Sequence, residues 1–364
     1  MKSTIRIAYL AMSAAIIAGL ASCNGNEKVR SHYGELISFT AGSNASAVSK
    51  TAYSGSVTSD GERIDWTYND VIRIYCEQAS DPPLKRADYA IDAGSISGSG
   101  AVSEAKIEHT RRIGLHWGDI DKAHIFYAVC PSPIDDDDIG DVLGNGSLRG
   151  HIPAVQAVNS TSAESGNIKA KPDMSSMYLV AHRTLAAGVQ DVGDVFLSFT
   201  PITTAIEFSI QNAYSSGNDM CISALTLTSE SKSLSGVFTS DLAGWSGDYP
   251  TCAAAGDNGS SVSIEFATPV VVPFGKTLDF TMFMLPVSDV DDLTFKITKP
   301  DGTWLSLKLS YETGTGISFA RCKKSYVSGI LVPEGVEWTV NYSDPWLVSW
   351  DNGINSNVPL KKED

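Results

Sequence analysis

The chain of 364 residues is acidic, with 42 Asp and Glu against 27 Lys and Arg and a net charge of −15 at pH 7. An acidic chain without a basic cluster excludes nucleic acid as the expected partner, because phosphate binding requires Lys and Arg. The 31 glycines, together with many Ser, Thr and Asn residues, predict a chain rich in turns.

The first 22 residues have the pattern of a bacterial export signal. Lys2 and Arg6 give a positive start, and the apolar run over residues 7–21 is too short for a comfortable membrane span. The run ends in Leu-Ala-Ser-Cys, which resembles the lipobox in which the cysteine takes a diacylglycerol and becomes the new N-terminus. We therefore expect Cys23 to be lipidated and to anchor the chain at the outer membrane, because two or more acyl chains hold stably. A plain signal peptide with a chance cysteine is the alternative.

After the leader, short apolar or alternating runs recur between Gly, Asn, Asp, Ser and Pro, and long helical periodicity is almost absent. Runs such as "SVSIEF" and "LSLKLS" alternate with period two, as half-buried antiparallel strands do. The Pro-Asp-Gly turn at residues 300–302 predicts a hairpin between residues 293–298 and 304–310. Many strands without intervening helices favour an all-β fold of antiparallel sandwiches.

The length beyond the leader predicts two domains. Residues 131–176 carry an acid run and clustered glycines and are expected to form a long exposed loop. A change of composition near residues 188–194 precedes a fresh series of strands. The expected division is a signal peptide over residues 1–22, an N-terminal domain over 23–190 and a C-terminal domain over 191–364.

The cysteines beyond Cys23 are odd in number, so at least one is unpaired or pairs between chains. They contain no CxxC and no zinc-type spacing. Cys76 and Cys130 lie in strand-like apolar runs and are expected to be buried free thiols. A disulfide between Cys221 and Cys252 is one alternative. The five positions are Cys76, Cys130, Cys221, Cys252 and Cys322.

No enzyme motif emerges, since GxSxG, HExxH, a P-loop and GxGxxG after a strand are all missing from the sequence. We therefore expect that the chain is not an enzyme and binds no cofactor. No pair of its acidic residues can be singled out for glycoside hydrolysis. The acid run 135–138 and the group Asp289, Asp291 and Asp292 suggest calcium, but the EF-hand pattern fails because Ile139 replaces a ligand. Solvated loops are the expected alternative, and the six histidines are scattered.

Four segments occur in a recognisable order. The first has a strand, a basic residue before a small one, and then a Trp followed by an Asp and another strand. The second is an aromatic strand that ends in proline, the third is "HIPAVQ", and the fourth is a pair of strands. The segments are residues 37–75 (with Lys50, Trp66, Asp70 and Ile72), 124–133, 151–156 and 195–210.

In this order, and with a lipobox in front, the segments resemble the fimbrillin family of the Bacteroidales, the subunits of type V pili. The resemblance implies two transthyretin-like antiparallel β-sandwich domains in tandem and a structural role in a surface fibre. It also implies maturation by a protease that removes the first strand, which we place at residues 35–41.

The maturation site departs from the family pattern. The family protease is specific for arginine, whereas Lys50 stands at the matching place. Arg30 precedes the predicted strand, and Arg63 lies later, just before Trp66. Either a lysine-tolerant protease acts, or another basic site is used, or the protein stays lipid-anchored as a base or accessory subunit. Lys50 is the leading candidate, because its surroundings are polar and rich in small residues.

The C-terminal segment contains two runs that alternate as strands do. Their aromatic side chains need burial because each covers roughly 150–250 Å². Either both strands pack on their own domain, or at least one inserts into the groove of the next subunit as a donor. The donor candidates are Trp338, Val340, Tyr342, Trp346, Val348 and Trp350.

Three functions follow from these patterns. The first is a subunit of a surface pilus, with other pilin subunits as partners and a place in the fimbrium after maturation. The second is a monomeric, lipid-anchored surface adhesin that binds a host or bacterial ligand through its loops. The third is a hydrolase built on a β-sandwich.

Overall fold

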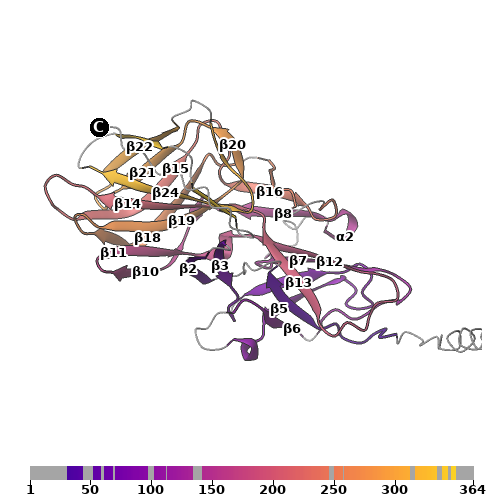
Figure 1. The fold of residues 1–364 in the computed structure, drawn as a ribbon. Coiled ribbons are helices and arrows are strands. Elements are labelled where there is room, and N and C mark those ends of the chain that lie inside the picture. Colours follow the sequence, from indigo (N-terminus) through magenta and orange to yellow (C-terminus); the bar gives the residue numbers. More distant parts are fainter. Residues whose placement is uncertain are drawn as a thin grey trace, which may run out of the picture.

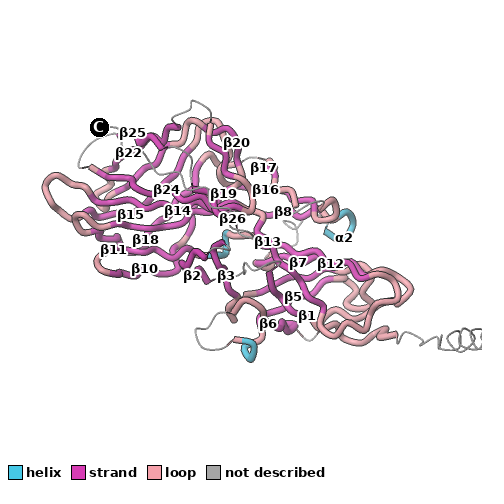
Figure 2. Tube along the Cα trace, in the orientation of Figure 1, coloured by secondary structure: helices cyan, strands magenta, loops and turns pink. Residues whose placement is uncertain are grey.

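The computed structural model is almost wholly β-structure (Figures 1 and 2), which confirms the all-β prediction. Among the described residues no helix is long and apolar enough to cross a membrane. Cys23 and the export signal lie outside the described residues. The structure describes residues 31–43, 52–58, 61–68, 70–96, 102–111, 113–133, 142–245, 250–256, 258–311, 316–333, 338–342 and 346–349.

Seven strands close into a barrel in the hydrogen-bonded order β1-β13-β12-β7-β4-β5-β6. Every neighbouring pair is antiparallel except β1 and β13, which run parallel. The hydrogen bonds therefore pass around the whole ring rather than forming two separate sheets. The strands are β1 (Phe39–Ser43), β4 (Val71–Tyr75), β5 (Arg86–Ile91), β6 (Ala105–His109), β7 (His124–Cys130), β12 (Leu179–Leu185) and β13 (Val195–Pro201).

Aromatic side chains fill the barrel. Phe39 meets Tyr89 edge-on at 5.2 Å between ring centroids and Phe126 at 5.5 Å. Trp66, fully buried just before β4, meets Phe199 in the same way at 5.1 Å. Edge-to-face pairs add about 0.5–1.5 kcal/mol each beyond the burial of apolar area.

Two six-stranded sheets form a second group, in the orders β10-β11-β19-β14-β24-β26 and β25-β22-β21-β15-β18-β9. Phe208, Phe280 and Phe295 stack between the two sheets at 5.1–5.7 Å. The strands are β9 (Val155–Gln156), β10 (Val158–Glu164), β11 (Asn167–Pro172), β14 (Thr204–Asn212), β15 (Met220–Thr228), β18 (Ser261–Val272), β19 (Thr277–Met284), β21 (Thr294–Thr298), β22 (Trp304–Tyr311), β24 (Lys323–Val332), β25 (Trp338–Tyr342) and β26 (Trp346–Ser349).

The predicted hairpin is present between β21 and β22. The N–H of Gly302 donates to the carbonyl of Lys299 at 3.0 Å, and Gly302 has φ of 83°. A residue with a side chain would be strained there, so the glycine suits the turn.

A three-stranded sheet joins the barrel to the second group. Its apolar face packs in one cluster with Tyr75 and Val180 of the barrel and with Leu285 at the end of β19. Smaller pairs and single turns complete the fold. These elements are β8 (Ser147–Ile152), β16 (Gly236–Asp241) and β17 (Ala253–Ala254) in the joining sheet, the pairs β2 (Ala52–Thr58) with β3 (Gly61–Asp65) and β20 (Val287–Val290) with β23 (Ile317–Phe319), and the turns η1 (Ala93–Ser95), α2 (Val142–Asn145) and η3 (Met174–Ser176).

The prediction of one long loop over residues 131–176 is wrong, because β8 to β11 lie there. The sequence of β10 shows no alternation of apolar and polar residues, because nearly all of its residues are exposed. Hydrogen bonds to β11 hold β10 at the rim of a sheet. Sheet membership also changes more than once along the chain: β9 to β11 join the second group, whereas β13 joins the barrel. The division into domains at residue 190 stays a prediction.

Gln156 of the "HIPAVQ" segment fastens β9 beside the end of β19. Its buried side-chain oxygen accepts a hydrogen bond from the N–H of Phe283 at 2.9 Å, and its amide nitrogen donates to the carbonyl of the same residue. The side chain thus occupies the place of a neighbouring strand.

We expect Gln156→Ala to lower the free energy of unfolding by about 1–3 kcal/mol, because it leaves buried backbone groups of Phe283 without a partner. Urea denaturation measures this. Gln211→Ala is the control, since Gln211 makes one exposed bond to the carbonyl of Gly275; a loss as large in the control contradicts the role of Gln156.

His124 is buried at the start of β7. Its Nε2 lies 3.2 Å from the N–H of Gly118, which donates to it, and its Nδ1 lies 3.1 Å from the carbonyl of Lys122. These partners fit a neutral ring with the proton on Nδ1. Burial lowers the pKa of His124 below its ordinary value.

The folded protein should therefore lose stability as the pH falls below about 6.5, since the unfolded state binds a proton that the folded state resists, and the loss ends once the pH passes the lowered pKa. Thermal unfolding between pH 7.5 and 5 measures it. The slope should be smaller in His124→Gln than in the parent chain. Equal slopes would show that other groups, such as His182, carry the dependence.

Candidate functional site

The first strand of the described residues, β1, lies inside the barrel wall, with partners on both sides. Phe39 of β1 stands opposite Val195 of β13 and Ile107 of β6. Before β1, the N–H of Ile37 donates to the carbonyl of Leu115 at 2.8 Å. The prediction of a first strand is confirmed, but the strand begins at Phe39 rather than residue 35, because residues 34–37 pair with residues 115–117 instead.

The inward side chains of this segment complete the barrel core. Ile37, Phe39 and Ala41 are all buried. On the other face, a Cβ at Gly42 would come within 2.6 Å of the Phe196 ring, so a larger residue there would have to displace that ring. Full burial of a side chain such as Ile37 or Phe39 contributes about 1.5–3 kcal/mol. An empty slot between β6 and β13 would therefore need another strand to fill it.

Polar side-chain contacts along β1 contribute less to its stability than the apolar burial does. The ammonium of Lys106 lies 3.1 Å from a carboxylate oxygen of Asp194, and the hydroxyl of Thr40 donates to the same oxygen at 3.4 Å. The Lys106 side chain is mostly exposed, and exposed ion pairs contribute about 0–1 kcal/mol. Apolar burial and the two ladders therefore hold the strand.

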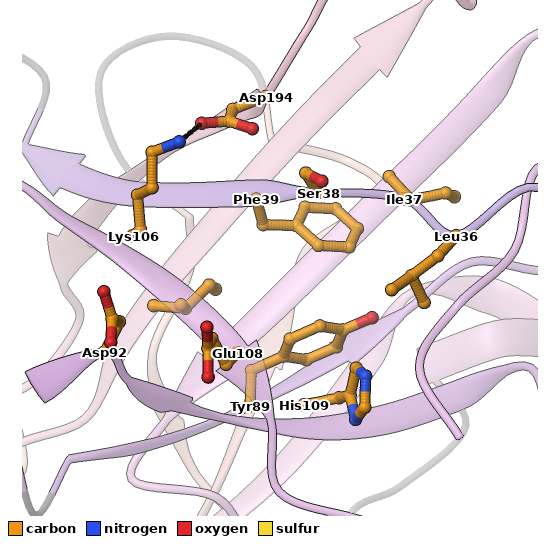
Figure 3. A pocket seen from close by; sticks show the side chains of 11 residues that line it. Leu36, Ile37, Ser38, Phe39, Tyr89, Asp92, Lys106, Glu108, His109 and Asp194 are labelled. Carbon is orange, nitrogen blue, oxygen red and sulfur yellow. Dashed lines mark ion pairs between the residues drawn. The ribbon is translucent and has the colours of Figure 1, made fainter. Parts of the chain in front are cut away.

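A cavity of about 370 Å³ opens where β1 and β6 diverge (Figure 3). Phe39 and Tyr89 line it from the barrel, while Asp92 and Glu108 bring carboxylates to it. The hydroxyl of Tyr89 accepts a hydrogen bond from the N–H of Leu115 at 2.8 Å, and burial raises its pKa, so the phenol stays neutral. The cavity combines apolar rings with acceptors and lies directly beside the first strand.

The three candidate cleavage sites differ in whether the structure describes them. Lys50 and Arg30 lie outside the described residues. Lys50 falls between the end of β1 at Ser43 and the start of β2 at Ala52. Arg63 lies within β3, whose backbone pairs with β2 on either side of it. A protease would have to unpair that ladder, which favours a cut elsewhere.

Both C-terminal strands pair within their own chain. β25 runs parallel to β22, with Trp338 opposite Leu307 and Val340 opposite Leu309. β26 runs antiparallel to β24, with Trp346 opposite Tyr326. Each is the last strand of its sheet among the described residues, so each has a ladder on one side. Tyr342 and Val348 lie in these strands, and Trp350 lies outside the described residues.

No group of three metal-ligating side chains occurs in the described part of the chain. The acid run 135–138 is outside it. Asp292 instead closes a turn: it accepts 2.6 Å hydrogen bonds from the hydroxyl of Ser229 and the N–H of Ser231. Burial by itself raises the pKa of Asp292, but these hydrogen bonds outweigh it and hold that pKa below its usual value.

None of the five cysteines in the described part of the chain forms a disulfide. Cys76, Cys130 and Cys322 are buried, as predicted for the first two, and Cys221 and Cys252 are partly exposed without a bond between them. The alternative of a Cys221–Cys252 disulfide is therefore wrong: Cys221 lies in β15 of a six-stranded sheet, whereas Cys252 directly precedes β17 of the joining sheet.

No family model and no curated protein matches the chain. Similar solved structures include two proposed cell adhesion proteins, from Bacteroides uniformis (12% identity, 82% of this chain and 94% of the other, TM-score 0.47) and Bacteroides ovatus (11%, 92% and 100%, 0.46). A fimbrial assembly protein from Parabacteroides distasonis is similar at 11% identity over 81% and 90% of the two chains, with a TM-score of 0.34. Scores this low assign no function, so the proposal below rests on the residues of this chain.

Phe39→Ala should lower the free energy of unfolding by about 3–5 kcal/mol, because it leaves a cavity among Tyr89, Phe126 and the neighbouring strands. Phe274→Ala is the control, since Phe274 is exposed and should change stability by less than about 0.5 kcal/mol. Chemical denaturation of both variants gives the comparison. Similar losses would show that β1 is not a main support of the barrel.

Proposed function

We propose that this chain is a structural subunit of a cell-surface fibre of the type V pilus kind, in which neighbouring subunits exchange a strand. The observation that carries the proposal is the position of β1. It has ladders on both sides, it buries Phe39 and Ala41 in the barrel, and only the connection that contains Lys50 joins it to β2.

One cut at Lys50 would separate two things from the subunit at once. The segment before the cut carries Cys23, the proposed lipidation site, and also β1. Its loss frees the protein from the outer membrane and opens a slot between β6 and β13. The slot exposes apolar core residues and two unpaired strand edges. Insertion of a strand from another subunit is therefore favourable, because it buries the apolar residues and pairs both edges.

The C-terminal strands β25 and β26 are the proposed donors. In their own chain each pairs along one edge, whereas a strand in the slot pairs along two. The exchange therefore gains a ladder for each transferred strand. The donor side chains are those of Trp338, Val340, Tyr342, Trp346, Val348 and Trp350.

The finer description of the subunit belongs to the same proposal. We infer two transthyretin-like units, over residues 23–190 and 191–364, that exchange strands: β9 to β11 of the first lie in the sheets of the second, and β13 of the second closes the barrel of the first. The precursor is lipid-anchored at the cell surface, and the matured subunit lies in the fimbrium with other pilin subunits. Its role is structural rather than enzymatic.

A second function has one observation in its favour. The cavity beside β1 exists only while β1 is in place, because Leu36, Ile37 and Phe39 form part of its lining. An uncleaved, lipid-anchored subunit could use it to bind a host or bacterial surface ligand. The Lys50 that replaces the family arginine fits this adhesin as well.

Treatment of the folded chain with a lysine-specific protease should release the segment before Thr51 and yield fibres visible by negative-stain electron microscopy. Deletion of residues 336–364 should leave a folded monomer that the protease still cuts but that forms no fibres. Added to the cleaved parent chain, this truncated chain should shorten the fibres, because it accepts a strand and donates none.

Uncleaved parent chain is the control. Fibres from the truncated chain alone would exclude the C-terminal strands as donors. Cleavage without any fibres from the parent chain would favour the lipid-anchored adhesin.

A further inference from the structure

One end of the barrel carries a set of exposed apolar side chains, which we call the apolar end. Leu84 is 66% exposed and Ile113 is 49% exposed. Both lie in connections between barrel strands, where polar residues would be expected. The set consists of Tyr33, Leu36, Leu84, Ile113, Val189 and Val192.

Hydrogen bonds between the connections bring this set together. The N–H of His116 donates to the carbonyl of Asp81 at 3.0 Å, which places the turn before Leu84 beside the segment that follows Ile113. The N–H of Gly34 donates to the carbonyl of Trp117 at 2.8 Å. The N–H of His32 donates to the side-chain oxygen of Gln190 at 2.9 Å, which brings Tyr33 to the connection between β12 and β13.

The described chain also begins at this end. Figure 1 shows the indigo start of the chain at the tip of the barrel away from the two six-stranded sheets. Ser31 lies only eight positions after Cys23. A fully extended segment of that length reaches about 28 Å. A lipid on Cys23 therefore holds the apolar end within one short tether of the membrane surface.

We propose that the apolar end itself binds a lipid surface and that the lipid on Cys23 brings it there, an inference that rests on the lipid anchor of the proposed function. Apolar tips enter the interface between headgroups and acyl chains, as they do in other peripheral proteins. The connections carry charges of both signs, Asp81 and Lys85 between β4 and β5, and Arg111 and Asp119 between β6 and β7, so binding depends on apolar contact more than on salt.

A lipid surface fits this end better than a second copy of the chain. A stable protein interface needs about 800 Å² of complementary surface on each partner. The apolar end instead presents single side chains on separate connections, and the tether brings it to the membrane in every lipidated molecule.

Docking has a consequence for release. Tyr33 and Leu36 precede Lys50, so a cut there removes them together with the lipid. The same cut that opens the barrel slot thus weakens the remaining contact with the membrane. The two six-stranded sheets, at the other end of the molecule, stay directed away from the surface.

The test uses the chain from Asn24 onward, which keeps every described residue and lacks the export signal and the lipidated cysteine. Vesicles of phosphatidylcholine and phosphatidylethanolamine are mixed with it and floated on a density gradient. The parent chain should float with the vesicles. The double variant Leu84→Asp with Ile113→Asp should bind about tenfold less, because two apolar anchors are lost.

Phe274→Asp with Trp304→Asp is the matched control, since these side chains are 53% and 51% exposed elsewhere on the molecule, and it should float like the parent. Unfolding midpoints of all three chains should agree. Failure of the parent to float overturns the inference, as does an equal loss in the control. A dimer in sedimentation that the double variant abolishes, without vesicle binding, overturns it in favour of a second copy.

Fibre formation after proteolysis is scored separately on the same proteins. Loss of vesicle binding with normal fibres contradicts only the docking, and loss of fibres with normal vesicle binding contradicts only the proposed fibre function.

Discussion

Burial of the first strand between β6 and β13 is the constraint on which the barrel depends. Phe39 contacts Tyr89 and Phe126 across the core, so the N-terminal strand closes a ring that the rest of the chain leaves open. A strand near a chain end is the easiest one to replace, because only one covalent connection holds it. The same burial that stabilises the precursor would thus drive assembly once that connection is cut.

The joining sheet packs the barrel against the second set of sheets. Its cluster contains Tyr75 from the outer face of β4 and Leu285 from the end of β19, and Gln156 ties β9 to Phe283 nearby. The barrel and the second group therefore share a packed boundary rather than a loose linker. A fibre built from such subunits gains stiffness from that boundary.

Local patterns in the sequence predicted much of the fold. Period-two alternation identified β18 and β22. The Pro-Asp-Gly turn identified the hairpin that joins β21 to β22. The pattern failed for β10, because a strand at a sheet rim with exposed side chains has no alternation to detect. The parallel pairing of β1 with β13 joins residues more than 150 positions apart, and the apolar end depends on contacts among separate connections. Neither leaves a signal in short windows of sequence.

A disulfide that locks the first strand tests the account most directly. Ala41 of β1 and Ala105 of β6 are buried directly opposite one another, so Ala41→Cys with Ala105→Cys places two thiols in register. After proteolysis at Lys50, the oxidised protein should remain monomeric in electron micrographs, and reduction should start fibre growth. Fibres from the fully oxidised protein would show that the first strand does not have to leave, and would contradict strand exchange at this slot.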